Sequence, residues 1–132
     1  MSKINQIEQA LLEIDQASFH KLCDAYLYKL GYRDIESVGV VPGKNVTKKG
    51  TPDSFRLLPS GYYWFIEYSV QKKGLFDKFY ADLEKCFNEE KTGIPIKKIE
   101  KVILGYTSIL LPKEQEQLRK KCEENKCNIE FI

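Results

Sequence analysis

The sequence predicts an α/β fold, a mixed central sheet flanked by helices, and three observations predict it. Apolar patterning indicates two helices, then three strands, then helix, strand, helix and strand. A helix that joins the third strand to the fourth implies a crossover connection, as parallel strands require. The 132 residues are 42% hydrophobic and 12% aromatic, as in globular proteins. We therefore expect a single domain spanning residues 1–132.

Two helices are expected at residues 3–16 and 18–30. The first has apolar residues at spacings of three and four, namely Ile4, Ile7, Leu11 and Ile14. In the second, Ser18 is the expected N-cap and Gly31 the stop. Its expected buried stripe consists of Phe19, Leu22, Cys23, Tyr26, Leu27 and Leu30. His20, the only histidine, borders this stripe, and a lone histidine there is more typical of a helix boundary than of a catalyst.

Three strands are expected next, at residues 33–41, 53–58 and 62–70. Pro42-Gly43 ends the first strand, and Pro59-Ser60-Gly61 is the turn between the other two. The first strand takes its apolar content from Ile35, Val38, Val40 and Val41. The second and third strands therefore form a hairpin.

The C-terminal part is expected to be helix, strand, helix, strand, at residues 75–91, 101–106, 113–125 and 128–132. Gly74 precedes the first of these helices, and Thr92-Gly93-Ile94-Pro95 breaks it. Pro112 suits the first position of the second helix. Because Leu118 is the only strong apolar residue of that helix, we expect the helix to lie on the surface.

The hairpin brings two carboxylates together. With Pro59, Ser60 and Gly61 as the loop, Leu58 faces Tyr62, and counting back along both strands places Asp53 opposite Glu67. Directly opposed residues share a sheet face, with Cβ atoms roughly 4.5–5.5 Å apart. Two such carboxylates either share a proton, which raises one pKa, or hold a cation. Oxygen ligands without a nearby His or Cys cluster favour Mg²⁺ or Mn²⁺ over zinc.

A polar row and a basic loop flank this pair. Phe65, Glu67, Ser69 and Gln71 share one face of the third strand; Trp64, Ile66, Tyr68 and Val70 share the other. The polar row is either a solvated face or a functional site. The loop before Asp53 carries three lysines, and a fourth follows the strand, namely Lys44, Lys48, Lys49 and Lys72. These lysines either face solvent or contact a phosphate backbone.

Charge and cysteine usage limit the other functional classes. The formal net charge is +2, from 21 basic and 19 acidic residues, too balanced to indicate nucleic-acid binding by itself. Four cysteines, Cys23, Cys86, Cys122 and Cys127, form no CxxC pair or Cys/His cluster. Because neither a signal peptide nor a long apolar run is present, we expect reduced thiols, a cytoplasmic location and no membrane association.

The order αβββαβ, with Pro52-Asp53 at the second strand and Glu67 on the third, resembles the PD-(D/E)xK nuclease superfamily. Within it the chain is most similar, from about Ser18 to Tyr106, to the Mrr-like restriction endonuclease and Holliday-junction resolvase type. It also resembles the N-terminal nuclease modules of antiviral STAND ATPases.

The resemblance implies a restriction-endonuclease-like core and Mg²⁺-dependent hydrolysis of DNA phosphodiesters. Asp53, Glu67 and the Tyr68 carbonyl would hold the ion, while Ser69 and Gln71 would orient water or ligand. It further implies a homodimer or larger assembly, other domains in a longer chain, and a role as an antiviral effector module.

One departure from the family pattern is at Ser69, where the family has its lysine. Either Lys78 of the following helix supplies the cation, or Gln71 and Lys73 form a Gln-x-Lys variant that moves the site along the strand. The expected hairpin register favours Lys78. In addition, His20 follows Phe19 where Mrr-like proteins tend to carry a glutamate.

Two other functions remain open at this point. The departure at Ser69 is compatible with a nuclease-like domain that has lost catalysis and binds only nucleic acid or a partner protein. A third possibility is an interaction domain whose Glu-Ser-Gln row contacts another chain.

Overall fold

The computed structural model describes residues 3–37 and 52–132, which form a mixed α/β fold with a five-stranded sheet. The α/β prediction is confirmed. The helices are α1 (Lys3–Glu13), α2 (Gln16–Lys29), α3 (Leu75–Cys86), α4 (Glu89–Thr92) and α5 (Pro112–Glu124), with a 3₁₀ turn, η1 (Ile96–Lys98). The strands are β1 (Ile35–Ser37), β2 (Ser54–Leu57), β3 (Tyr63–Ser69), β4 (Ile99–Tyr106) and β5 (Asn128–Phe131).

The strands lie in the order β1-β2-β3-β4-β5, so each strand pairs with its neighbour in the chain. β1, β2 and β3 pair antiparallel, whereas β3, β4 and β5 pair parallel. Parallel neighbours need crossover connections, and α3 and α5 provide them. The sheet is therefore mixed, as the predicted crossover requires.

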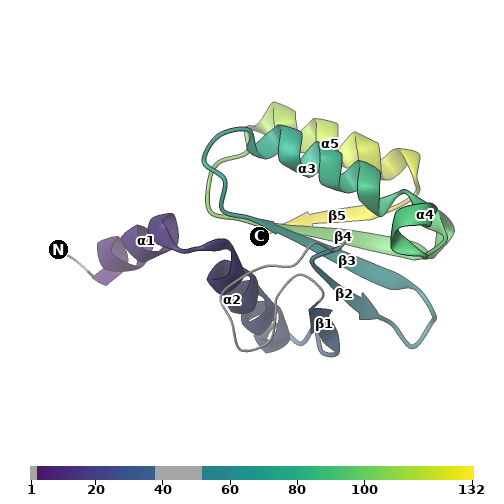
Figure 1. Ribbon diagram of the computed structural model, residues 1–132, viewed down its shortest axis with the longest axis horizontal. Coiled ribbons are helices and arrows are strands. Elements are labelled where there is room, and N and C mark those ends of the chain that lie inside the picture. Colours follow the sequence, from purple (N-terminus) through teal and green to yellow (C-terminus); the bar gives the residue numbers. More distant parts are fainter. Residues whose placement is uncertain (1–2, 38–51) are drawn as a thin grey trace.

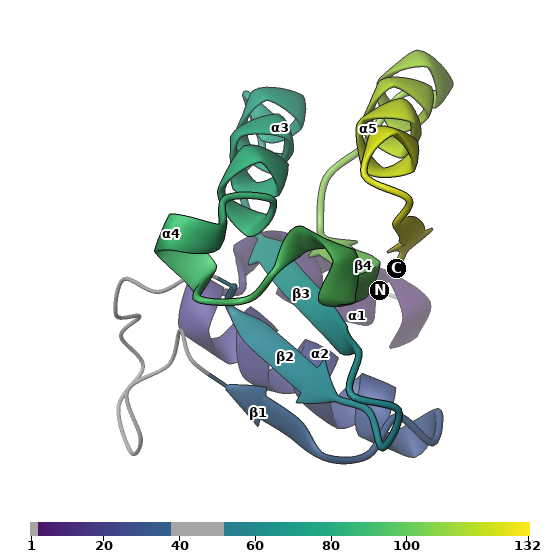
Figure 2. The same cartoon turned by 90° about the vertical axis from the view of Figure 1, so that its right-hand side faces the viewer.

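Helices cover both sheet faces. Figure 1 shows α3 and α5 side by side over one face, with α2 against the opposite face and α1 extending away from the body. The view in Figure 2 places α1 and α2 behind the sheet. One core packs Phe65, Val102 and Leu104 against α3 and α5; the other packs Ile66, Tyr68 and Ile103 against α2. Both faces of β3 are buried, including Glu67 and Ser69.

The predicted hairpin register is confirmed. Ser54 pairs with Ile66, and Leu57 pairs with Tyr63. At the turn, the Leu58 N–H donates to the Tyr62 carbonyl over 2.8 Å. Asp53, the residue before β2, therefore comes next to Glu67.

Helix α2 presents a different face to the sheet than its apolar pattern predicts. His20 is only 1% exposed, so it is a core residue and not a boundary residue. Leu22 and Tyr26, expected to be buried, are 46% and 51% exposed, and Leu30 is also exposed. The cause is a set of hydrogen bonds with β2: His20 is hydrogen-bonded to Ser54, whose hydroxyl donates to the Asp24 carboxylate, and these bonds turn both polar side chains inward. The N-cap is Asp15, whose carboxylate accepts the Ser18 N–H, so the expectation for Ser18 was wrong.

Other boundaries also differ from expectation. β3 ends at Ser69, and residues 70–74 form a bend leading to α3, so Gln71 is not a strand residue. The helix expected to reach residue 91 ends at Cys86, because Asn88 caps a separate short helix, α4. No residue of α1 is buried, so its apolar residues are not packed in the core; Ile4, for example, is 69% exposed. Residues 38–41 of the expected first strand lie outside the described residues.

Within residues 3–37 and 52–132, none of the helices combines the length and apolar character needed to cross a bilayer.

Gly105 of β4 allows α2 and β3 to approach β4. A Cβ at this position would lie 2.9 Å from Tyr68 Cδ1 and 3.3 Å from Cys23 Sγ. We therefore expect Gly105→Ala to lower the free energy of unfolding by about 1–3 kcal/mol, since the buried Tyr68 ring must shift. Urea denaturation measures this, with exposed Ala81→Ser as the control. An unchanged midpoint for Gly105→Ala would contradict the close packing.

Candidate functional site

Asp53, which directly precedes β2, and Glu67 of β3 form a pair of neighbouring carboxyls. The Asp53 Oδ2 atom accepts the Tyr68 backbone N–H over 2.8 Å, which fixes the Asp53 side chain against β3. Each carboxyl also shifts the pKa of the other, so the carboxyls of Asp53 and Glu67 are near neighbours. Two carboxyls this close cannot both stay ionised without a proton or a cation beside them. The structure thus brings together the two predicted acidic residues.

Burial shifts the titration of both carboxyls. Glu67 is 4% exposed, and its pKa lies well above the usual value because burial, followed by the charges of Asp53 and Asp82, disfavours its ionised form. The pKa of Asp53 is also raised by burial, although the hydrogen bond from the Tyr68 N–H partly opposes the shift. Burial therefore favours the protonated form of Glu67.

Lys78 supplies a cation beside this pair from the first turn of α3. Its Nζ atom is 2.6 Å from Asp82 Oδ2, one helical turn further along. Burial by itself would lower the pKa of Lys78, but Asp82, then Glu67 and Asp53, outweigh it and the pKa is raised. Lys78 therefore stays protonated within electrostatic reach of both carboxyls.

Cys86 and Gln16 are further contacts that sequence reasoning missed. The Cys86 thiol donates to Glu67 Oε1 over 3.5 Å, on the side of Glu67 that faces α3. The Gln16 side chain donates to the Tyr68 carbonyl over 2.8 Å and accepts the Val70 N–H over 3.2 Å. That carbonyl, a predicted metal ligand, therefore already accepts one hydrogen bond. The sequence could have indicated Asp82 as a partner of Lys78, because the two residues are spaced i,i+4. No sequence pattern indicated the contacts of Cys86 and Gln16.

The remaining predicted site residues do not all converge. Ser69 is fully buried at the end of β3, and its Oγ accepts the Gln71 N–H over 3.1 Å. Gln71 is exposed, and its side-chain amide donates to the Lys73 carbonyl over 3.2 Å. Lys72 is exposed on the bend that follows. Lys44, Lys48 and Lys49 lie outside the described residues.

The donor set fits a hard cation with few protein ligands. Where the chain is described, no three or more His, Cys, Asp or Glu side chains converge to hold a metal ion. Asp53 and Glu67 nevertheless offer two neighbouring carboxyls. Mg²⁺ is commonly bound by one or two carboxylates, with waters and substrate phosphates completing the shell. Binding would require Glu67 to release its proton, since ligands must be deprotonated.

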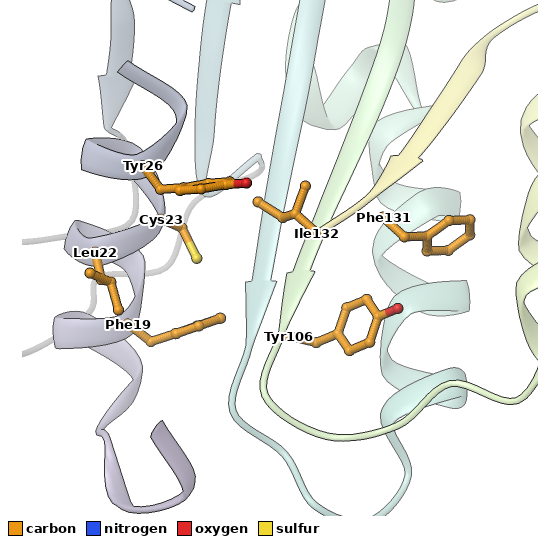
Figure 3. A pocket seen from close by; sticks show the side chains of 7 residues that line it. All are labelled: Phe19, Leu22, Cys23, Tyr26, Tyr106, Phe131 and Ile132. Carbon is orange, nitrogen blue, oxygen red and sulfur yellow. The ribbon is translucent and has the colours of Figure 1, made fainter. Parts of the chain in front are cut away.

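A separate groove of about 390 Å³ lies between α2 and the ends of β4 and β5. Figure 3 shows its lining, which is mainly apolar and aromatic. The lining residues are Phe19, Leu22, Cys23, Tyr26, Tyr106, Phe131 and Ile132. Because none of these is a carboxylate or a basic group, the groove has different chemistry from the acidic pair.

Comparison of the chain with family models, with curated proteins and with solved structures finds no match in any of the three.

The raised pKa of Glu67 makes a prediction about stability. Between about pH 4.5, where Glu67 titrates in the unfolded chain, and its higher folded value, the folded protein holds a proton that the unfolded chain has released. Stability must fall as pH rises through this window. We therefore expect Glu67→Gln, which imitates the protonated side chain, to raise Tm at pH 7.5 in EDTA, with a gain that vanishes near pH 4.5.

Thermal unfolding in EDTA across this pH range measures the effect, with exposed Glu84→Gln on α3 as the control. Each unit by which the pKa of Glu67 is raised corresponds to about 1.4 kcal/mol. A Glu67→Gln variant less stable than the parent at pH 7.5 would show that Glu67 is ionised in the folded protein.

Proposed function

We propose that this domain is a metal-dependent DNA endonuclease whose site is Asp53, Glu67 and Lys78. The observation that carries the proposal is that the β2–β3 register brings Asp53 next to buried Glu67, with the charge of Lys78 acting on both carboxyls. Burying two like-charged groups together is costly without a proton or a cation between them. A functional site explains that arrangement better than packing does.

The topology supports the same proposal at the level of fold. Helix α2, strands β1 to β3, helix α3 and strand β4 follow the αβββαβ order that the sequence resemblance implies. The first three strands are antiparallel and β3 and β4 are parallel, so the mixed sheet of a restriction-endonuclease-like core is compatible with this chain. Because folds host many functions, the proposal depends on the site more than on this similarity.

Mg²⁺ or Mn²⁺ bound at this position would polarise the scissile phosphate and lower the pKa of an attacking water. Asp53 and Glu67 would hold the ion, and the Tyr68 carbonyl would be a third ligand. Cys86 and the Tyr68 N–H keep the two carboxyls in place through their hydrogen bonds. The protein thus fixes two anionic ligands before substrate arrives.

Lys78 would act as a cation, not as a general base, since neighbouring carboxylates raise its pKa. A fixed positive charge near the developing charge on a phosphate is a strong source of transition-state stabilisation. In this structure Lys78 forms a salt bridge with Asp82. Because its side chain is 28% exposed, it can turn toward a phosphate. This geometry favours Lys78 over the Gln71 and Lys73 alternative, whose side chains are exposed beyond the strand end.

Peripheral residues would have supporting roles. The hydroxyl oxygen of buried Ser69 accepts the Gln71 N–H and so stabilises the start of the bend. The exposed side chain of Gln71 can orient water or substrate. Lys72, with Lys44, Lys48 and Lys49, which precede Asp53 in the sequence, would contact the DNA backbone. Cutting both strands requires two sites, so a homodimer or larger assembly within an antiviral defence protein is part of the proposal.

Nicking of supercoiled plasmid in Mg²⁺ or Mn²⁺ tests the activity. We expect Asp53→Asn, Glu67→Gln and Lys78→Met each to slow nicking by about 10²-fold or more, because each removes a ligand or the transition-state cation. Lys85→Met, an exposed lysine on the same helix, should cut at the parental rate. EDTA should abolish nicking by the parent.

The contrary outcome is equal nicking by the parent and all three site variants, which would identify a contaminant or another site. Activity lost in the Lys73→Met variant but kept in Lys78→Met would instead place the cation on the bend after β3.

A second candidate is a nuclease-like domain that binds DNA without cutting it, and Ser69 in place of the family's lysine favours it. In that case DNA affinity should fall steeply with salt, in proportion to the phosphates contacted. Fluorescence anisotropy measures the DNA affinity between 50 and 200 mM salt. Six phosphate contacts predict that the affinity falls about 10³-fold over this range. Salt-dependent binding with no nicking in any divalent ion would select this candidate; no binding at all would select an interaction domain.

A further inference from the structure

A polar cluster lies beneath the acidic pair, on the opposite face of the sheet. Ser54 follows Asp53 in the chain, and Tyr68 follows Glu67. Because successive side chains of a strand point to opposite faces, these two hydroxyl side chains point toward α2 while the carboxyls point toward α3. Both hydroxyls then meet a single acceptor, the carboxylate of Asp24 on α2.

The contacts of Asp24 are specific. The Ser54 hydroxyl donates to Asp24 over 3.1 Å to Oδ1 and 3.2 Å to Oδ2, and the Tyr68 hydroxyl donates to Oδ1. His20 Nε2 lies 3.4 Å from Asp24 Oδ2, 2.6 Å from Ser54 Oγ and 3.1 Å from Ser37 Oγ. Asp24 is thus linked to residues of β2 and β3, and through His20 to β1.

The chemistry of this cluster favours one arrangement. The Tyr68 and Ser54 hydroxyls both donate to the Asp24 carboxylate. Hydrogen bonds to a charged acceptor are shorter and about twice as strong as neutral ones. Two such bonds to one carboxylate fix the separation of Ser54 and Tyr68, and with it the separation of the residues before them.

Packing alone does not require this cluster. Leu27 and Cys23 already pack α2 against the sheet as apolar side chains. Buried polar networks bring a desolvation cost and are useful chiefly where they specify a geometry. His20 Nδ1 is buried and has no hydrogen-bond partner among the described residues, which is a cost that a purely structural cluster could avoid. The Gln16 side chain, from the same helix, also holds the Tyr68 carbonyl and the Val70 amide.

We propose that Asp24 is a positioning residue for the Asp53 and Glu67 ligand pair, acting through the hydroxyls of Ser54 and Tyr68. This inference rests on the proposed metal-dependent function. Asp24 itself does not contact the metal; it sets how far apart the two ligand-bearing strand ends lie. Groups that orient metal ligands typically change metal affinity by 10- to 100-fold when they are removed.

The test is the dissociation constant for Mn²⁺, measured by isothermal titration calorimetry on the whole chain, together with Tm. We expect Asp24→Ala to raise the dissociation constant by about 10- to 100-fold. Ser54→Ala and Tyr68→Phe, which delete one hydroxyl each, should raise it by smaller factors. Adding either hydroxyl deletion to Asp24→Ala should have little further effect, because the acceptor is already absent.

The matched control is Leu27→Ala, three residues along the same helix and fully buried against the same sheet face. It should lower Tm at least as much as Asp24→Ala while leaving the Mn²⁺ affinity unchanged. If Leu27→Ala weakens Mn²⁺ binding equally, Asp24 acts only through the general stability of α2 and the inference is wrong. If the parent binds Mn²⁺ and Asp24→Ala binds it as tightly, the inference fails while the proposed function stands. If the parent binds no Mn²⁺, both fail.

Discussion

The proximity of the Asp53 and Glu67 carboxyls is the constraint on which the rest of the proposed site depends. The β2 and β3 register places these residues opposite each other, and Cys86 of α3 contacts Glu67. Two carboxyls in such a place share a proton until a cation replaces it. Buried groups of this kind destabilise the fold, and proteins keep them where they serve a function. The site would therefore gain stability from its own ligand.

Each main element contributes one part of this arrangement. Strands β2 and β3 carry the two carboxyls, and the start of the crossover helix α3 places Lys78 beside them. Helix α2 lies against the other face and holds the same two strands through Asp24 and Gln16. The parallel pairing of β3 with β4 makes α3 cross the sheet and brings its first turn to the end of β3. The topology and the chemistry are thus linked at one strand end.

Local signals predicted much of the fold and the pairing of Asp53 with Glu67. The Pro59-Ser60-Gly61 turn fixed the hairpin register, and with it the pairing of Asp53 and Glu67, because turn length determines register. Pro112 marked the start of α5, and Lys78 was one of two candidates for the cation. Ends of elements were less predictable: the α2 cap is Asp15, not Ser18, since both are good capping residues.

Residues whose role depends on tertiary contacts were not predictable. His20 appeared to border an apolar stripe, but hydrogen bonds to Ser54 and Ser37 turn it into the core and turn Leu22 and Tyr26 outward. Apolar periodicity cannot predict such a rotation of the helix, because a prediction from periodicity places every polar residue on the surface. Gln16 and Cys86 likewise depend on partners 52 and 19 residues away in the chain.

The most direct test of the central claim is to locate a divalent ion. Crystals grown or soaked in Mn²⁺ would show it as a peak in anomalous difference density. The account predicts one peak between Asp53 and Glu67, bound to a carboxylate oxygen of each and with the proton of Glu67 displaced. A carboxyl pair with no peak beside it in saturating Mn²⁺ would contradict the account.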